Sequence, residues 1–514
     1  MTQTTNWRSA PRRLARKIAV LGCAAAIAGA AASCKDFLEP KPSDVLSPEN
    51  FYHSAADAVA AVDAAYAQLP WADFWIWYVT DVPTDDIIAS ANFGADGHQL
   101  SNYTFDETLW VLNTIWGDHY VTINRANIVL DRVPSIVMDT TLRSRVLGEA
   151  HYIRALMYFD IVRFWGDAPL IEHEAKTVAE AQVARSPKAD VYALIVSDLQ
   201  AAAASLPESY SGTDIGRATS GAAKSLLAKV YLEQKDYNNA AKLAGEVMNS
   251  GVYHLNPVWK DNFRIATEFT NPESIFEVNY TAPEETPGGV GSVQTLFSLP
   301  QGYPGGDAYG LMQVTPSLVN LFASNDQRGN HGTFMKPPYT DLMGRTTTWG
   351  VPAYSKDTPG GAAFDKYLDE TNTKDMTARA WQQQPNNWVI QRYADVLLIY
   401  AEAVDNGGAA TAGSKEDALY EVAHRSNPNA TRVTTNFTDS LRVERRKEFV
   451  FEGQRWFDLS RWGILNETFL KKTAEVLALF PGEVDHVYGV TKELMPIPSG
   501  QLTTNPKLTQ NPGW

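Results

Sequence analysis

The chain of 514 residues contains only two cysteines, Cys23 and Cys34, and both lie near its N-terminus. A disulfide framework or a cysteine-based metal site needs more cysteines than this in the body of the chain. We therefore expect a fold that is stable from its hydrophobic core alone, which a chain of this length can bury easily.

Positive charge is also scarce. The sequence has 44 Lys and Arg against 59 Asp and Glu, a formal net charge of −15 at pH 7. Phosphate contacts from basic side chains supply most of the affinity of nucleic-acid binders, so this acidity argues against nucleic acid as a partner. Neutral ligands fit the charge better.

Recognisable catalytic motifs are absent: there is no P-loop, Gly-x-Gly-x-x-Gly, His-Glu-x-x-His or Gly-x-Ser-x-Gly. Neighbours such as those in Glu172-His173-Glu174 do not face one another, so we interpret this segment as a solvated loop. The adjacent Asp85 and Asp86 favour a helix N-terminus over a catalytic pair. We expect no enzyme activity, cofactor or metal; a surface glycosidase is the enzymatic alternative, and the lack of a convincing acid pair counts against it.

No apolar run reaches the roughly 20 residues of a membrane span. Residues 1–33 carry five basic residues and no acid, and their Ala-rich run ends in Ala31-Ala32-Ser33-Cys34. This pattern predicts a signal peptide over 1–33 with Cys34 as the lipidated residue of a bacterial lipoprotein. The proline-containing segment 34–50 is then an extended tether leading to a single domain over 51–514.

Long amphipathic patterns predict helices, most clearly in residues 223–248. There a helix containing Ala228 meets a short turn at Lys235-Asp236, and Ala240 and Ala241 lie at the expected crossing, as in a tetratricopeptide (TPR) hairpin. The fold class is therefore mainly α, with TPR-like helical hairpins beside an irregular, loop-rich half. The helical regions are about 54–69, 109–165, 188–250, 393–424 and 441–462, and the loop-rich excursions are about 70–108 and 252–392.

Aromatic residues gather in the loop-rich segments, most densely in PWADFWIWYVT over 70–80. Flat rings stack on the apolar faces of sugars, while nearby polar side chains bond to their hydroxyls. Burial of the cluster is the alternative. The candidate ligand-binding residues are Trp71, Asp73, Phe74, Trp75, Trp77, Tyr78, Asn92 and Asp96, with a second set in Gly/Pro-rich loops at Tyr303, Tyr309 and Trp349.

The segment 442–462 is densely charged. Arginine–carboxylate pairs can lock helices to loops through bidentate hydrogen bonds, so we interpret its charges as a structural network in preference to a ligand site. The residues concerned are Arg442, Glu444, Arg445, Glu448, Glu452, Arg455, Asp458 and Arg461.

Five segments together resemble the SusD/RagB family of nutrient-binding lipoproteins. They are Cys34–Pro40, Gly148–Leu170, Gly216–Thr219, Arg392–Ala403 and Arg442–Gly463, and the C-terminal Pro496–Pro498 and Asn511–Trp514 are similar too. The shortened segment Ala423–Asn427 departs from the family pattern and leaves the local hairpin in doubt.

The resemblance implies a surface-facing outer-membrane lipoprotein, anchored at Cys34, with TPR-like helix pairs on one side and a ligand-binding side opposite. It also implies capture of oligosaccharides for a SusC-type TonB-dependent transporter, without catalysis. Capture of oligopeptides by the same architecture is the alternative, and a TPR scaffold that binds only protein partners is a third possibility.

Overall fold

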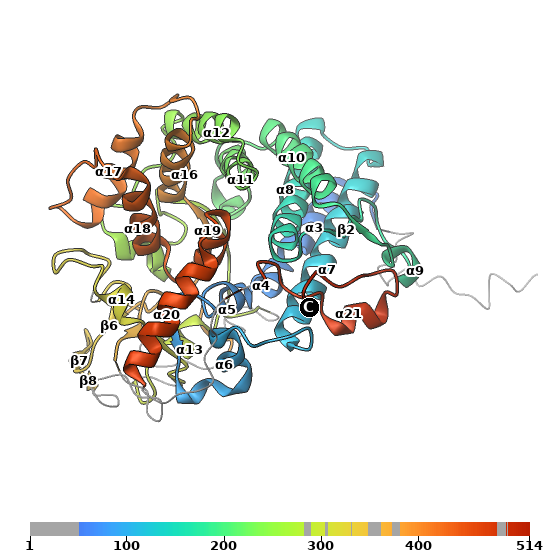
Figure 1. The fold of residues 1–514 in the computed structure, drawn as a ribbon. Helices are drawn as coiled ribbons and strands as arrows, with labels where there is room; N and C mark the ends of the chain where they lie inside the picture. The colour runs from blue at the N-terminus through green and yellow to red at the C-terminus, as the bar shows by residue number, and fades with distance from the viewer. Residues whose placement is uncertain are drawn as a thin grey trace, which may run out of the picture. The chain divides into compact units, whose positions relative to one another are not determined.

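Successive helices pack on one another along most of the chain. The computed structural model describes residues 51–281, 289–303, 307–329, 331–347, 361–372, 381–480, 490 and 492–514, and Ser54–Trp514 form one compact unit. Its longer helices are α3 (Ala55–Tyr66), α7 (Trp110–Arg132), α8 (Thr140–Trp165), α10 (Lys188–Ser205), α11 (Ser220–Glu233), α12 (Tyr237–Asn249), α16 (Tyr393–Asp405), α17 (Lys415–Ser426), α18 (Phe437–Phe449) and α20 (Leu465–Leu479). The contacts run from α7 to α8, α10, α11, α12, α16 and α17 in turn, and this order confirms the predicted helix pairs (Figure 1).

Side-chain caps fix where several of these helices begin. Ser54 and Asp57 form a reciprocal capping box at the start of α3. The side chain of Thr219 caps α11. Asp236 caps α12 directly after Lys235, whose φ of 60° makes the tight turn of the predicted TPR-like hairpin.

Small residues let the helices of this hairpin approach closely. Ala228 of α11 and Ala240, Ala241 and Ala244 of α12 are buried. Gly245 of α12 lies against the connection that follows α16, and a side chain at this position would collide with Thr411 of that connection. The close packing of α11, α12 and α16 therefore depends on residues that carry little or no side chain.

The loop-rich half contains short antiparallel strand pairs. They are β1 (Ile87–Ala89) with β5 (Met312–Val314), β4 (Ser274–Val278) with β10 (Trp388–Arg392), β6 (Phe334–Met335) with β9 (Ala363–Phe364) and β7 (Tyr339–Thr340) with β8 (Thr346–Thr347), while β2 (Ala168–Pro169) and β3 (Arg185–Ser186) pair among the helices. Strand β4 lies within the predicted loop-rich excursion 252–392. Since β10 leads directly into α16, the β4–β10 pair joins the loops to the helical stack.

The single helix predicted over 441–462 is wrong. Helix α18 ends at Phe449, and α19 (Arg455–Arg461) follows a turn in which Phe451 and Gly453 have φ values of 60° and 71°. The Gly453 amide donates to Asp81 Oδ2 at 2.9 Å. The turn therefore anchors the chain to the loop that follows the aromatic segment, which a continuous helix could not do.

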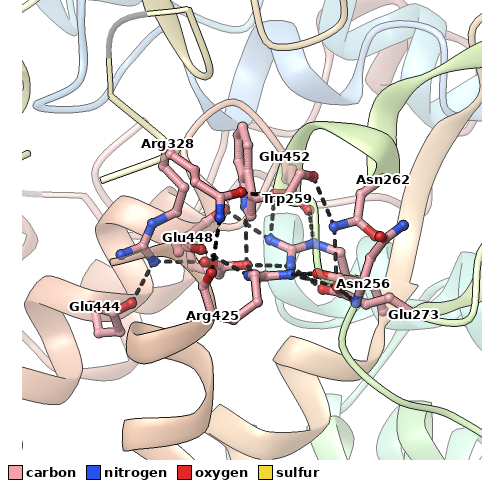
Figure 2. A network of polar contacts seen from close by, with 12 residues as sticks. Asn256, Trp259, Asn262, Glu273, Arg328, Arg425, Glu444, Glu448 and Glu452 are labelled. Atoms are coloured by element: carbon pink, nitrogen blue, oxygen red, sulfur yellow. Dashed lines mark hydrogen bonds and ion pairs between the residues drawn. The ribbon is translucent and has the colours of Figure 1, made fainter. Parts of the chain in front are cut away.

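Buried arginine–carboxylate pairs hold this turn in place. Arg392 donates to Glu452 (2.9 and 2.8 Å), to Glu448 (2.6 Å) and to Glu273 (2.7 Å). Arg328 and Arg425 also bind Glu448 (Figure 2). Burial alone raises the pKa of Glu448, but Arg425, Arg392 and Arg328 together hold it well below its usual range.

The other charged residues of this segment make similar contacts, with one exception. Glu444 accepts from Arg328, Arg445 binds Asp458 at 2.8 and 3.0 Å, Arg455 binds Asp85 at 2.9 Å through two nitrogens, and Arg461 binds Glu402 at 3.0 Å through two nitrogens. Arg442 instead lies half-buried over the Trp462 ring, 5.2 Å from its centre. The charged side chains of this segment thus stabilise the fold, and because most of them are paired, few are available to bind a ligand.

In the part of the chain that the structure describes, no helix has both the length and the apolarity of a membrane span.

Candidate functional site

Four tryptophans form a surface that we call the tryptophan platform: Trp71, Trp75, Trp110 and Trp381. Trp71, Trp110 and Trp381 have 44%, 43% and 44% of their surface exposed, although tryptophan is usually highly buried. The half-buried Trp75 lies between two of them, its ring centre 5.0 Å from that of Trp110 and 6.3 Å from that of Trp381. The exposed rings therefore belong to one cluster.

Buried aromatic rings support the platform from beneath. Phe74 packs against Trp71, Trp75 and Trp381 with ring-centre distances of 6.5, 4.9 and 6.4 Å. Phe297 of α13 (Gln294–Ser298) also contacts Trp75 and Trp381. Because these buried rings fill the space beneath the four tryptophans, the tryptophan side chains are held in place without a bound ligand.

Separate stretches of sequence supply the platform. Trp71 belongs to the short helix α4 (Leu69–Ala72), and Trp75 precedes α5 (Ile76–Thr80). Trp110 is the first residue of α7, and Trp381 begins the segment that leads to β10. Only the tertiary fold brings these side chains together.

Polar groups lie at the edge of the platform. The Trp110 indole N–H donates to Asp96 Oδ2 at 2.7 Å, which fixes the ring, and Asp96 belongs to α6 (Gly94–Asn102). The exposed Asn92 donates to the Tyr309 carbonyl at 3.1 Å and reaches Gln301 Oε1 at 3.5 Å. Carboxylate and amide groups are thus available beside flat apolar rings.

The predicted ligand-binding residues fall into an exposed group and a buried group in the structure. Trp71, Trp75, Asn92, Asp96 and Tyr309 lie at the platform or its edge, where a ligand could reach them. The interior contains Asp73, Phe74, Trp77, Tyr78 and Tyr303, each with less than a tenth of its surface exposed. These five are therefore corrected from ligand contacts to residues of the supporting core, while Trp349 lies outside the described residues.

Asp73 illustrates why burial excludes ligand contact. It lines a small interior cavity together with Asp160, Arg163 and Lys229. Burial raises the pKa of Asp73 well above its usual range, and the nearby Asp160 raises it further. Its carboxyl group belongs to the junction between α8, α11 and β10.

Sequence reasoning missed Trp110 and Trp381. Trp110 starts an amphipathic helix, and such a position resembles any other helical aromatic residue. Trp381 stands in the Gln- and Asn-rich segment WQQQPNN, far from the other aromatics. Neither position carries a local signal of exposure, which depends on how the helix and the loops pack.

The other candidate clusters have structural partners. Asp85 and Asp86 precede strand β1, so their interpretation as a helix N-terminus is wrong; Asp85 binds Arg455 and Asp86 binds Arg446 at 2.7 Å. The segment 172–174 is a loop, as expected, with His173 Nδ1 2.9 Å from Asp131. Within the described ranges no group of three or more His, Cys, Asp or Glu residues could hold a metal ion.

Two family models match the chain, one described as "SusD family" over residues 352–514 and one as "Starch-binding associating with outer membrane" over 36–232. A "SusD-like protein P2" of Formosa agariphila is 26% identical over 94% of this chain and 97% of its own length. Among solved structures, a "Laminarin binding SusD-like protein" is 25% identical with a TM-score of 0.73, covering 90% of this chain and all of the other. A "Surface glycan-binding protein A from Bacteroides fluxus", 23% identical with a TM-score of 0.76 and the same coverage, shares the fold.

This chain belongs to the SusD family. The two matched segments contain most of the helical stack, but α12 lies between them, and so do Glu273 and Arg328 of the buried arginine–carboxylate network. They also contain all four tryptophans of the platform, whereas Tyr309 and Gln301 lie between the matched segments. In this SusD-family protein the edge of the platform is therefore built partly from a stretch that neither family model matches.

Proposed function

We propose that this SusD-family protein captures an oligosaccharide or polysaccharide on the tryptophan platform. The observation that carries the proposal is the exposure of three indole rings in one cluster: Trp110 and Trp381 contact the half-buried Trp75, and Trp71 contacts Phe74 beside it. Sugar rings present apolar C–H faces that stack on flat aromatic rings, and their hydroxyl groups need hydrogen-bond partners at the ring edge. Asp96, Asn92 and Gln301 supply such partners.

Binding without catalysis fits the acids near the platform. Glycoside hydrolysis uses two carboxyl groups on either side of the scissile bond. Asp96 is bound to the Trp110 indole, and the carboxylates of Asp85 and Asp86 are bound to arginines. We therefore assign capture and release of an intact glycan to this surface.

The family and the N-terminal pattern support a place of action, although residues 1–50 lie outside the described residues. We infer that Cys34 carries the lipid, that residues 34–50 tether the domain to the outward face of the outer membrane, and that a SusC-type TonB-dependent transporter receives the ligand. A matched family model is described as associating with the outer membrane, which supports this location. The laminarin-binding neighbour supports a glycan, and laminarin is the first polysaccharide to test.

Affinity gel electrophoresis tests the proposal. The protein lacking residues 1–34 is run through gels containing laminarin or other neutral polysaccharides, beside a Trp381→Ala variant. A Leu470→Ala variant is the matched control, because Leu470 is also an exposed apolar residue, 44% exposed on α20, but lies outside the platform. Retardation of the wild type and the control by one polysaccharide, reduced in Trp381→Ala, is the expected result.

Binding of oligopeptides in a parallel library assay, with no retardation by any polysaccharide, would overturn glycan capture and favour peptide capture. Binding of neither ligand would favour a scaffold whose exposed tryptophans contact another protein.

A further inference from the structure

A groove adjoins helix α4, which carries Trp71 of the platform. Its volume is about 340 Å³, and it is lined by Tyr66, Pro70, Gly216, Glu277, Asn279 and Val290, among others. A smaller pocket of about 160 Å³ shares Gly216, Glu277 and Asn279 with it, so the two adjoin. The larger volume is in the range of small-ligand sites, roughly 300–1,000 Å³.

Both walls of the groove lead to the platform. One wall is Pro70, the residue before Trp71. The other includes Gly289 and Val290, and the next residue, Gly291, donates its N–H at 3.1 Å to the carbonyl of Gln382, which follows Trp381. The groove is therefore bounded by residues that adjoin Trp71 and Trp381 in the chain or in the backbone hydrogen bonding.

A buried carboxyl group lies beneath the groove. Glu277 is 8% exposed, and its Oε2 accepts from Asn387 Nδ2 at 3.0 Å. Ser274 also hydrogen-bonds to this carboxyl group and lowers its pKa. Glu277 therefore positions Asn387 under the groove, and the exposed groups beside it are the ones that a ligand could contact.

An amide stands beside this carboxyl group. Asn279 is exposed, and its Oδ1 accepts from Asn387 Nδ2 at 3.0 Å, which fixes the orientation of the amide. A Cβ at Gly216, whose φ is 97°, would lie 2.8 Å from Asn279 Nδ2. The glycine therefore leaves room for this amide at the surface of the groove.

The acids of the groove favour a neutral ligand. Burial raises the pKa of Glu268, which lines the smaller pocket, to about 9, and burial also raises the pKa of Glu277. A protonated carboxyl group can donate and accept, as a sugar hydroxyl does, whereas an ammonium or guanidinium group requires a carboxylate. The exposed Phe269 and Val252 add an apolar rim that suits the C–H face of a sugar.

We propose that the groove at Glu277 and Asn279 is a further subsite for neutral sugar residues, continuous with the tryptophan platform. The bound ligand is then a chain of several sugars that spans both, and the protein selects for chain length. This inference rests on the proposed glycan capture.

Calorimetric titration with laminari-oligosaccharides of increasing length tests this subsite. If the protein is retarded by a polysaccharide other than laminarin, oligosaccharides of that polysaccharide are used instead. The wild type is compared with Asn279→Ala and Glu277→Gln, and Asn429→Ala is the control because Asn429 is an exposed asparagine in the α17–α18 connection. We expect wild-type affinity to rise by about tenfold once the chain reaches the groove, the effect of one or two hydrogen bonds. Asn279→Ala should lose this rise and keep the affinity for short chains. Glu277→Gln keeps a neutral group that accepts from Asn387, so it should behave as wild type, and so should Asn429→Ala.

An equal rise with chain length in wild type and Asn279→Ala would overturn the subsite and leave the platform intact. Absence of binding at every length in the wild type would instead remove the proposed glycan capture, and the subsite with it. Because Asn279 is exposed, its truncation leaves the core unchanged, and circular dichroism verifies that each variant is folded.

Discussion

At the residue scale, the carboxyl group of Glu268 reduces the stability of the fold at neutral pH. Burial raises its pKa to about 9, whereas in the unfolded chain it titrates near 4.5. Between these values the folded state holds a proton that the unfolded state has released, so stability falls as the pH rises through this window. Such a cost is typical of residues retained for binding.

We predict that Glu268→Gln stabilises the protein by about 1–3 kcal/mol at pH 8, because glutamine is neutral at every pH. At pH 4, where glutamate is mostly protonated in both states, the two proteins should differ little. Urea denaturation at the two pH values measures the difference. A Glu268→Gln variant less stable than wild type at pH 8 would mean that the folded protein holds Glu268 as a carboxylate.

Single residues also show what the sequence could indicate about the site. The dense segment 70–80 pointed to the region of Trp71 and Trp75, since clustered aromatic residues in a loop indicate either a core or a binding surface. It could not separate the exposed Trp71 from the fully buried Trp77. That distinction depends on Phe297 and Trp381, which come from distant parts of the chain.

At the scale of elements, the helices were predictable because their apolar periodicity and caps are local properties. The break between α18 and α19 was not, because charged residues continue at helical spacing from Glu444 through Glu448 to Glu452. The chain turns there because Arg392 binds both Glu448 and Glu452 and because Gly453 accepts a positive φ. Long-range ion pairs of this kind leave no periodic signal.

The turn between α18 and α19 should be sensitive to substitution at Gly453. A Cβ there would adopt a φ of 71° and lie 3.2 Å from Trp388 Cζ2 and 3.3 Å from Thr80 Oγ1. We predict that Gly453→Ala lowers the free energy of unfolding by about 2–3 kcal/mol, from backbone strain and overpacking together.

Gly463, after α19, is the matched control. Its φ is 68°, but nothing lies within 4 Å of the position of a Cβ. Gly463→Ala should therefore cost only the backbone strain, about 1 kcal/mol. Equal losses for the two variants in chemical denaturation would show that the turn is not closely packed.

At the scale of the whole molecule, the chain divides into a frame and a surface. Most of the helical stack lies in segments that the family models match, and its helices were the parts most readily predicted. The tryptophan platform combines α4, α7, the edge of α13 and the segment before β10. Its composition depends on the assembled tertiary structure and could not be derived from any local pattern.

Attachment to the membrane is a second property of the whole molecule. We predict that Cys34→Ser abolishes acylation and moves the protein from the membrane fraction to the soluble fraction, because Cys34 follows the small residues of the expected cleavage site. Cys23→Ser is the matched control and should remain acylated. Metabolic labelling with a fatty acid, followed by fractionation, measures both, and labelling of the Cys34→Ser protein would contradict the assignment of the anchor.

The central claim is that the tryptophan platform binds glycan, and a calorimetric titration of a Trp110→Ala/Trp381→Ala double variant tests it most directly. The polysaccharide is the one that retards the wild-type protein, and Leu470→Ala serves again as the control. The loss of each stacked ring should weaken binding by about tenfold, so the double variant should show affinity reduced by about 100-fold or more while remaining folded. Wild-type affinity in the folded double variant would contradict the account and place the glycan elsewhere on the molecule.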